Sequence, residues 1–112
     1  MSRNTYIEYD RKNVEHLFDS DLILLVTATE LETKYTHQRI TPINGYKKII
    51  RVYEGNHTYY FGMFGRYKVA HVECSMGSVS RDSSIMTIST ALKLLKSKVV
   101  IMIGIAFGID PE

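Results

Sequence analysis

The stretch DLILLVTA, residues 21–28, is apolar at nearly every position and does not alternate with polar residues. An uninterrupted apolar run of this length is typical of a β-strand that is covered on both faces, as strands in the middle of a parallel sheet are. The stretch VVIMIGI, residues 99–105, has the same character. We therefore expect two buried strands, and such strands need helices above and below the sheet.

A helix is expected directly after the first of these strands. Thr29 is a candidate N-cap, and Glu30 and Glu32 stand in the first turn, where the helix dipole favours acidic side chains. Leu31 and Tyr35 are four residues apart, so we expect both to face the sheet. Strand and helix together form one βα unit of an α/β fold.

The middle of the chain has the residues of antiparallel strands. Residues 46–54 and 58–64 are rich in β-forming residues and flank a Gly-Asn turn, which predicts a hairpin. Residues 67–74 predict a further strand, and residues 80–96 carry apolar side chains at helical spacing. The expected order is therefore β-α-β-β-β-α-β, an α/β layer fold with a mixed sheet.

The two ends of the chain are less regular. Residues 1–20 are polar except for a small apolar stripe, and we expect an N-terminal arm or short helix there. The stripe, Val14, Leu17 and Phe18, either docks on the domain or belongs with an upstream segment. At the other end, Asp110-Pro111-Glu112 has the residues of a helix start. We therefore expect residues 21–112 to be part of a larger domain.

Composition excludes several classes of function. The 14 basic and 12 acidic residues give a net charge of +2, too small to favour nucleic acid or an anionic membrane as a partner. No apolar run approaches the roughly 20 residues of a spanning helix, and the N-terminus lacks the apolar core of a secretory signal. The single cysteine, Cys74, excludes internal disulfides, and we expect it to be a small buried residue. We expect a cytoplasmic protein.

Motifs for phosphate or metal binding are absent from the sequence. It contains neither a Walker A loop nor a Gly-x-Gly-x-x-Gly fingerprint, and no histidine pair has the spacing of metal ligands. The histidines His16, His37, His57 and His71 are scattered, and His71 is expected to be structural because it alternates with apolar residues on a strand. We therefore expect no metal and no cofactor.

Three turns lie where ligands bind in open α/β sheets, at the C-terminal ends of expected strands. They comprise residues 27–32, 75–78 and 104–108. Glycines in the last two let backbone amides approach a ligand closely, although ordinary βα turns also need glycine. Taken together, on strands that a sheet can bring side by side, they favour a ligand site.

At these turns the sequence resembles the purine nucleoside phosphorylase and nucleosidase superfamily, which includes methylthioadenosine/adenosylhomocysteine nucleosidase. The resemblance implies a partial three-layer, phosphorylase-like α/β fold with a mixed central β-sheet, of which residues 21–112 supply the N-terminal half. It runs in order through the first strand and turn (24–32), the hairpin (46–65), a strand ending in a Gly-hydrophobic-Gly type turn (72–77), and the strand and loop under the nucleoside (98–108).

The resemblance implies cleavage of the N-glycosidic bond of a purine nucleoside. Glu32 stands where nucleosidases keep the glutamate that activates water, although it can equally be a solvated first-turn acid. Glu32 and Met102 occupy the positions of phosphate-binding arginines in many phosphorylases, so the resemblance favours hydrolysis over phosphorolysis. The residues that it implies for substrate binding are Thr27, Ala28, Met76, Gly77, Ser78, Gly104, Ile105, Ala106 and Phe107.

Two replacements and one missing segment set this chain apart from the family. Ile105 replaces a usual serine, and Phe107 replaces a glycine. The family's ribose-binding Met-Glu segment and its catalytic aspartate lie in a second half of the domain, so we expect this chain alone to be inactive. One alternative is a non-catalytic nucleoside-binding or sensor module of a larger multidomain protein. Another is an interaction unit whose exposed sheet edge drives self-association. We expect a homo-oligomer that binds a small-molecule nucleoside.

Overall fold

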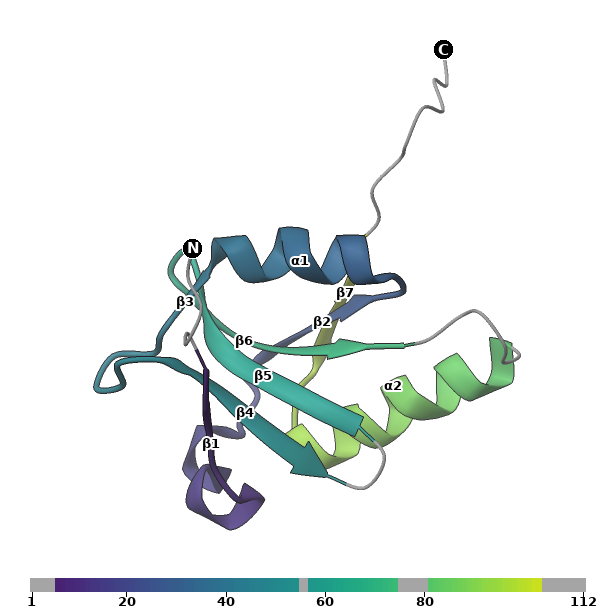
Figure 1. The fold of residues 1–112 in the computed structure, drawn as a ribbon. Coiled ribbons are helices and arrows are strands. Elements are labelled where there is room, and N and C mark those ends of the chain that lie inside the picture. Colours follow the sequence, from purple (N-terminus) through teal and green to yellow (C-terminus); the bar gives the residue numbers. More distant parts are fainter. Residues whose placement is uncertain (1–5, 55–56, 75–80, 104–112) are drawn as a thin grey trace.

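The computed structural model describes residues 6–54, 57–74 and 81–103, with the side chains of all of them except residues 81–85. Within these residues it shows an α/β fold built on one seven-stranded mixed sheet (Figure 1). The elements in chain order are β1 (Tyr6–Glu8), two 3₁₀ turns (Arg11–Asn13 and Glu15–Leu17), β2 (Ile23–Thr27), α1 (Glu30–Arg39), β3 (Ile40–Thr41), β4 (Ile49–Glu54), β5 (His57–Phe64), β6 (Tyr67–Glu73), α2 (Arg81–Leu95) and β7 (Val99–Met102). The expected α/β class and mixed sheet are confirmed.

The sheet has the strand order β1-β4-β5-β6-β2-β7, with β3 paired to β5 beside this path. β2 lies between β6 and β7 and is parallel to both, whereas β4, β5 and β6 are antiparallel neighbours. Val26 of β2 stands opposite Val72 of β6 and Met102 of β7. The three parallel strands therefore end side by side at one edge of the sheet.

The two helices cover opposite faces of the sheet and complete the three layers. Successive strand residues point to opposite faces, so Leu24 packs in the larger apolar cluster, together with Ala91 and Leu95 of α2. Leu25 belongs to the smaller cluster on the other face, where Ile40 follows directly after α1. Both faces of β2 are therefore buried, as its uninterrupted apolar run predicts.

The N-terminal segment docks on the domain through its small apolar stripe. Val14, Leu17 and Phe18 are all buried in the larger cluster, and the Phe18 ring stacks on Phe61 at 5.5 Å between centroids. The structure adds β1, which pairs in parallel with β4 and was not predicted. A strand of three residues that is held by backbone pairing carries almost no sequence signal.

Helix α1 turns a different side to the sheet than its apolar residues predicted. Leu31 and Tyr35 are 51% and 42% exposed, so the expectation that they face the sheet is wrong. Thr33 and His37 face it instead, through hydrogen bonds to side chains of the strands beneath. The helix docks through polar groups, and the hydrophobic spacing of its sequence therefore misplaces its inner face.

The last described strand is also less buried than expected. Val99, Ile101 and Met102 of β7 are 45%, 45% and 63% exposed. Within the described part of the chain, β7 pairs with β2 alone and forms the edge of the sheet. Val100 packs against the larger apolar cluster, but the other three side chains of the strand stay largely exposed. The expectation of a second strand covered on both faces is therefore wrong for the residues described.

Candidate functional site

The carboxyl ends of β6, β2 and β7 are fixed against one another by backbone hydrogen bonds. Thr27 at the end of β2 is in register with Glu73 at the end of β6. Just beyond the strands, the Cys74 N–H donates to the Thr27 carbonyl and the Ile103 N–H donates to the Val26 carbonyl, each at 2.8 Å. The three turns that the sequence marked therefore start from neighbouring points on one edge.

Glu32 closes the turn between β2 and α1. The Thr29 hydroxyl accepts a hydrogen bond from the Glu32 N–H at 3.1 Å, and Glu32 Oε1 accepts one from the Ala28 N–H at 2.8 Å. This reciprocal arrangement is close to a capping box, in which the third helical residue bonds back to the residues before the helix. It confirms Thr29 as the N-cap and holds the Glu32 carboxylate at the end of β2.

Only part of the predicted site falls on described residues. Thr27 is buried, while Ala28 and Glu32 are partly buried in the first turn. Cys74 is buried as expected, and burial raises the pKa of its thiol. The other predicted substrate-binding residues lie outside the described residues, as does the expected helix start at residues 110–112. They are Met76, Gly77, Ser78, Gly104, Ile105, Ala106 and Phe107.

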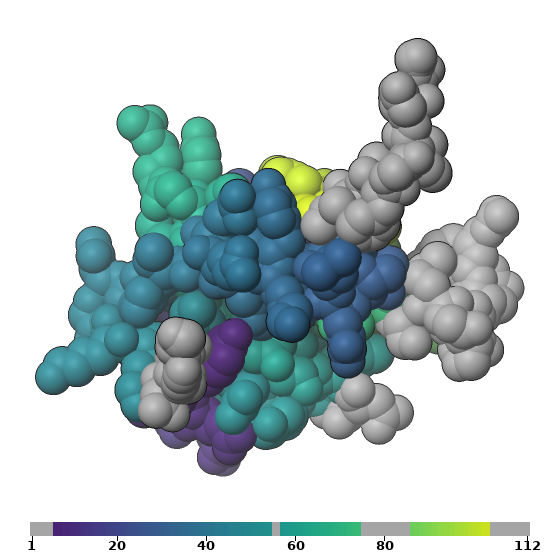
Figure 2. Space-filling view, turned by 45° about the horizontal axis from the view of Figure 1, so that its top comes forward, coloured from purple at the N-terminus to yellow at the C-terminus, as the bar shows by residue number. Residues whose placement is uncertain are grey.

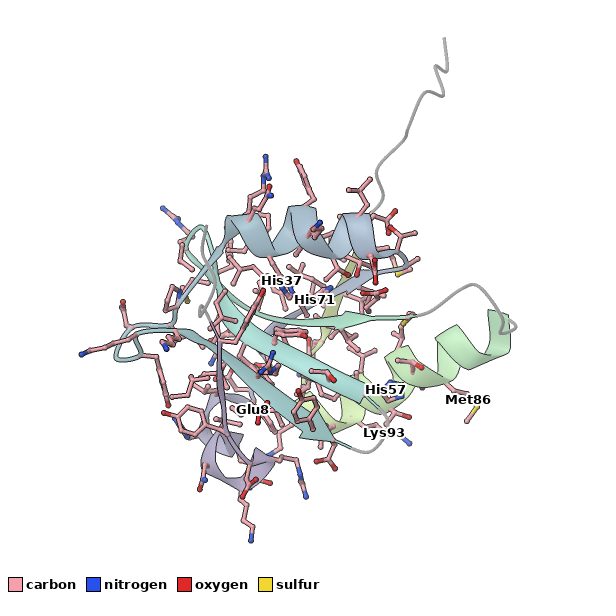
Figure 3. All side chains as sticks on the ribbon, viewed as in Figure 1. Glu8, His37, His57, His71, Met86 and Lys93 are labelled. Atoms are coloured by element: carbon pink, nitrogen blue, oxygen red, sulfur yellow. The ribbon has the colours of Figure 1, made fainter. Side chains whose placement is uncertain are left out.

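A row of hydrogen-bonded side chains runs beneath α1 to the same edge, and sequence reasoning missed it. We call its members the histidine network: Tyr6, His37, His71, Thr27, Thr33 and Glu73. The joined atoms are Tyr6 Oη and His37 Nδ1 (2.7 Å), His37 Nε2 and His71 Nδ1 (2.9 Å), His71 Nε2 and Thr27 Oγ1 (2.8 Å), Thr27 Oγ1 and Thr33 Oγ1 (2.7 Å), and Thr33 Oγ1 and Glu73 Oε1 (2.8 Å). His37 and His71 lie between the helix and the sheet (Figure 3).

Aromatic rings surround the two imidazoles. The His37 ring meets Tyr60 edge to face at 4.4 Å between centroids and His71 at 4.7 Å, with Tyr6 at 5.6 Å on a further side. Edge-to-face geometry is the favoured arrangement for such rings. The packing restrains the ring planes, and the hydrogen bonds of the network place both nitrogens of each imidazole along it.

Both histidines are uncharged at neutral pH. Burial lowers the pKa of His37 to about 4, and burial followed by the neighbouring His37 lowers the pKa of His71 to about 3. Because an imidazolium would lose its hydration here, the neutral form is strongly favoured. Each ring therefore carries one N–H donor and one acceptor nitrogen.

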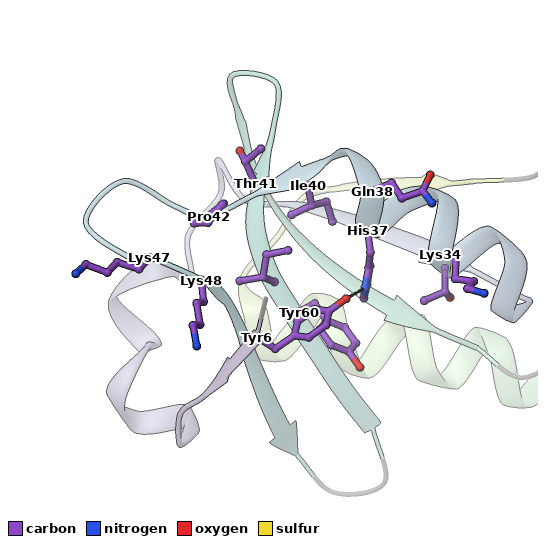
Figure 4. A pocket seen from close by; sticks show the side chains of 12 residues that line it. Tyr6, Lys34, His37, Gln38, Ile40, Thr41, Pro42, Lys47, Lys48 and Tyr60 are labelled. Atoms are coloured by element: carbon purple, nitrogen blue, oxygen red, sulfur yellow. Dashed lines mark hydrogen bonds between the residues drawn. The ribbon is translucent and has the colours of Figure 1, made fainter. Parts of the chain in front are cut away.

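A groove of about 740 Å³ opens beside the network, between α1, β1 and the turn before β4 (Figure 4). Tyr6, His37 and Tyr60 form its aromatic wall, and Lys34 and Lys48 contribute to its rim. Figure 2 shows α1, in blue, lying across this face of the molecule, with β1 in purple and the β4–β5 region in teal beside it. The Tyr6 end of the network therefore borders the groove, while its Glu73 end lies at the carboxyl edge.

Two features are absent from the part of the chain that the structure describes. No three side chains among His, Cys, Asp and Glu come together there as metal ligands would. In the same residues, neither helix combines the length and the apolar content needed to cross a membrane. The polar side chains described near the carboxyl edge include the carboxylates of Glu32 and Glu73, the hydroxyls of Thr27 and Thr33, and the imidazole of His71.

Comparison with known proteins points toward nucleosidases. No protein-family model matches the sequence. A "Death domain-containing ATP nucleosidase" from Amphimedon queenslandica is 30% identical over 92 residues, which cover 78% of this chain and 17% of that protein. The chain therefore spans about a sixth of the length of this curated relative. It is similar to part of a protein with a nucleosidase name, in keeping with the resemblance found in the sequence.

Proposed function

We propose that this chain is part of a nucleosidase that hydrolyses the N-glycosidic bond of a purine nucleoside or nucleotide. The observation that carries the proposal is the 30% identity over 92 residues to a protein named as an ATP nucleosidase. The parallel ends of β6, β2 and β7 support it, because ligands of open α/β sheets bind outside the carboxyl ends of the strands.

In this proposal Glu32 is the general base. It accepts a proton from water while the water oxygen bonds to C1′ of the sugar, and the bond from C1′ to the base nitrogen breaks. The electron pair of that bond goes to the base, whose protonation the family resemblance assigns to a residue of the second half of the domain. Because a carboxylate accepts several hydrogen bonds, capping the Ala28 N–H and holding a water are compatible roles.

The decisive experiment separates the two roles of Glu32 in the full-length protein. Glu32→Gln keeps an oxygen that can accept from the Ala28 N–H, so the helix cap survives, but the amide cannot take a proton from water. Glu30→Gln is the matched control, since Glu30 is an exposed acid of the same helical turn. Release of free base from ATP, adenosine and methylthioadenosine is followed by chromatography, with and without phosphate.

We expect Glu32→Gln to lower base release on the order of 100- to 10,000-fold, which is the usual contribution of general acid–base catalysis. Glu30→Gln should retain the wild-type rate, and both variants should unfold at nearly the same urea concentration as wild type. If wild type releases no base from any of these compounds, the proposed activity is wrong. Binding without turnover would instead support a sensor module, the role suggested by Ile105 and Phe107.

A further inference from the structure

The hydrogen bonds of the histidine network have a single direction, and Glu73 sets it. A carboxylate only accepts hydrogen bonds, so the Thr33 hydroxyl donates its one proton to Glu73. Thr33 must then accept from the Thr27 hydroxyl, and Thr27 in turn must accept from a nitrogen of His71. Each donor is used once, and each points toward the carboxylate.

The same logic assigns the form of both imidazoles. His71 donates from Nε2 and therefore accepts at Nδ1, where Nε2–H of His37 reaches it. His37 Nδ1 then accepts from the Tyr6 hydroxyl. Both histidines are thus neutral Nε2–H tautomers, and every donor and acceptor of the two rings is satisfied.

A network of this kind is costly for the fold unless it is complete. His71 is fully buried and Thr27 is 1% exposed, so either would carry a large penalty if it lost its partner. Apolar side chains at these positions could pack the layer between α1 and the sheet without that risk. Compared with an apolar layer, the hydrogen-bonded network additionally fixes the position of the side chain at its last member, Glu73.

That side chain lies at the candidate site. Glu73 is the last residue of β6 and stands opposite Thr27, at the edge where the turn to Glu32 begins. It is only partly buried, and the Thr33 hydroxyl is its one hydrogen-bond partner among the described residues. Its second carboxylate oxygen therefore keeps its capacity to accept hydrogen bonds at this edge.

We propose that Glu73 binds the nucleoside, by accepting hydrogen bonds from its sugar hydroxyls or from the amino group of its base, and that the histidine network holds its carboxylate in position. Thr33 is then a positioning residue that acts through Glu73. The inference rests on the proposed function for its ligand, and it adds a binding carboxylate that the sequence did not mark. Holding the acceptor in place before binding lowers the ordering cost of association.

The test measures the affinity of the full-length protein by calorimetry for three probes: adenosine, 2′,3′-dideoxyadenosine and purine riboside. The second lacks two sugar hydroxyls, and the third lacks the amino group of the base. Glu73→Gln replaces the charged acceptor with an amide. We expect it to weaken adenosine binding on the order of 10- to 100-fold, as loss of a hydrogen bond to a charged group does. The loss of affinity caused by Glu73→Gln should be small for the probe that lacks the hydrogen-bond donor bound by Glu73.

Thr33 supplies a second variant that leaves the carboxylate itself intact. Thr33→Val removes the hydroxyl that holds Glu73, and Thr33→Ser restores it. Thr33→Val should lose less affinity than Glu73→Gln does, and the loss should depend on the probe in the same way. Thr33→Ser should bind all three probes like wild type. Thr41→Val, at an exposed threonine of β3, is the control and should change none of the three affinities.

The outcomes separate this inference from the proposed activity. A pattern that singles out dideoxyadenosine assigns Glu73 to the sugar, and one that singles out purine riboside assigns it to the base. Equal weakening of all three probes, unchanged binding by Glu73→Gln, or no binding by wild type would overturn the inference. If wild type binds with the expected pattern but releases no base, the hydrolysis proposal fails while the role of Glu73 in binding stands.

Discussion

Acidification from about pH 7.5 to about pH 5.5 should destabilise this protein chiefly through two residues, His37 and His71. Their pKa values are about 4 and about 3 in the folded protein, against the ordinary value of 6.5 that applies to the unfolded chain. Between these limits the unfolded state binds two protons that the folded state does not, so the free energy of unfolding falls as the pH falls. The contribution of the two neutral histidines to the free energy of unfolding is fully present above pH 6.5. It declines below that pH until the histidines of the folded protein protonate, at about pH 4 and about pH 3.

The magnitude follows from the width of that window. Each group costs about 1.4 kcal/mol for every pH unit below its unfolded pKa, and about one such unit lies between pH 6.5 and pH 5.5. Two histidines together therefore cost about 3 kcal/mol, a large share of the 5–15 kcal/mol that is typical for a domain. The groups that face the two imidazoles are the phenols of Tyr6 and Tyr60 and the Thr27 hydroxyl. Burial raises the pKa of Tyr60, so that phenol stays uncharged in this range.

Urea unfolding at the two pH values measures this effect. In the variant His37→Gln/His71→Gln, the amides can still donate and accept but do not titrate, so most of the 3 kcal/mol difference should vanish. His16→Gln, which removes an imidazole outside the network, is the control and should lose as much stability as wild type. Titrating groups other than the substituted histidines are common to all three proteins and cancel in the comparison.

Two results would refute this reasoning. One is a double variant that loses as much stability as wild type when the pH falls. The other comes from a measurement on wild type, which remains available if the double variant does not fold. Imidazole nitrogen chemical shifts of His37 and His71 in folded wild type should stay constant from pH 7.5 to about pH 5.5 and should report Nε2–H tautomers. A titration of either ring inside that range would show that burial does not hold it neutral.

Two further substitutions test how the sheet is packed and joined. Gly62→Ala would place a Cβ only 2.7 Å from the Thr41 carbonyl oxygen of the neighbouring strand. We expect it to lower the free energy of unfolding in urea by about 1–3 kcal/mol. An unchanged urea midpoint would mean that β3 is not packed against β5. Ser97→Ala removes a buried hydroxyl that donates to the Leu22 carbonyl at 2.6 Å and should cost about 1–3 kcal/mol. Ser89→Ala, at an exposed position of α2, should leave the midpoint in place, and equal effects of the two serine variants would contradict the assignment.

Much of the fold could be predicted because its signals are local. The apolar run at residues 21–28 and the turn between residues 54 and 57 report burial and chain reversal within a few residues, and the structure has β2 and the β4–β5 hairpin there. The orientation of α1 could not be predicted in the same way. Its inner face is set by Thr33 and His37 bonding to strands that are distant in sequence. The exposure of Leu31 then follows from that docking, and helix periodicity alone does not contain it.

The histidine network was hidden from sequence reasoning for a related reason. Its members are spread from residue 6 to residue 73, and each side chain is unremarkable in its own segment. They meet only because His71 stands between Tyr60 of β5 and Leu25 of β2 in the register of the sheet. Alternation along β6 already separates His71 and Val69 from Ala70 and Val72, but it does not say which face α1 covers. One signal was available, since a histidine inside a buried strand needs polar partners.

The first turn of α1 now explains how two carboxylates come to one edge of the sheet. Successive helical residues point about 100° apart, so neighbours in one turn can serve different partners. Glu32 points back to the Ala28 N–H, while Thr33 points down to the sheet and holds Glu73. The positions of both acids therefore depend on the same turn, which Thr29 caps. An apolar face of α1 could pack on the sheet as well as the polar one does. It would not supply the Thr33 hydroxyl, and the Glu73 carboxylate at the end of β6 would then lack the hydrogen bond that holds it.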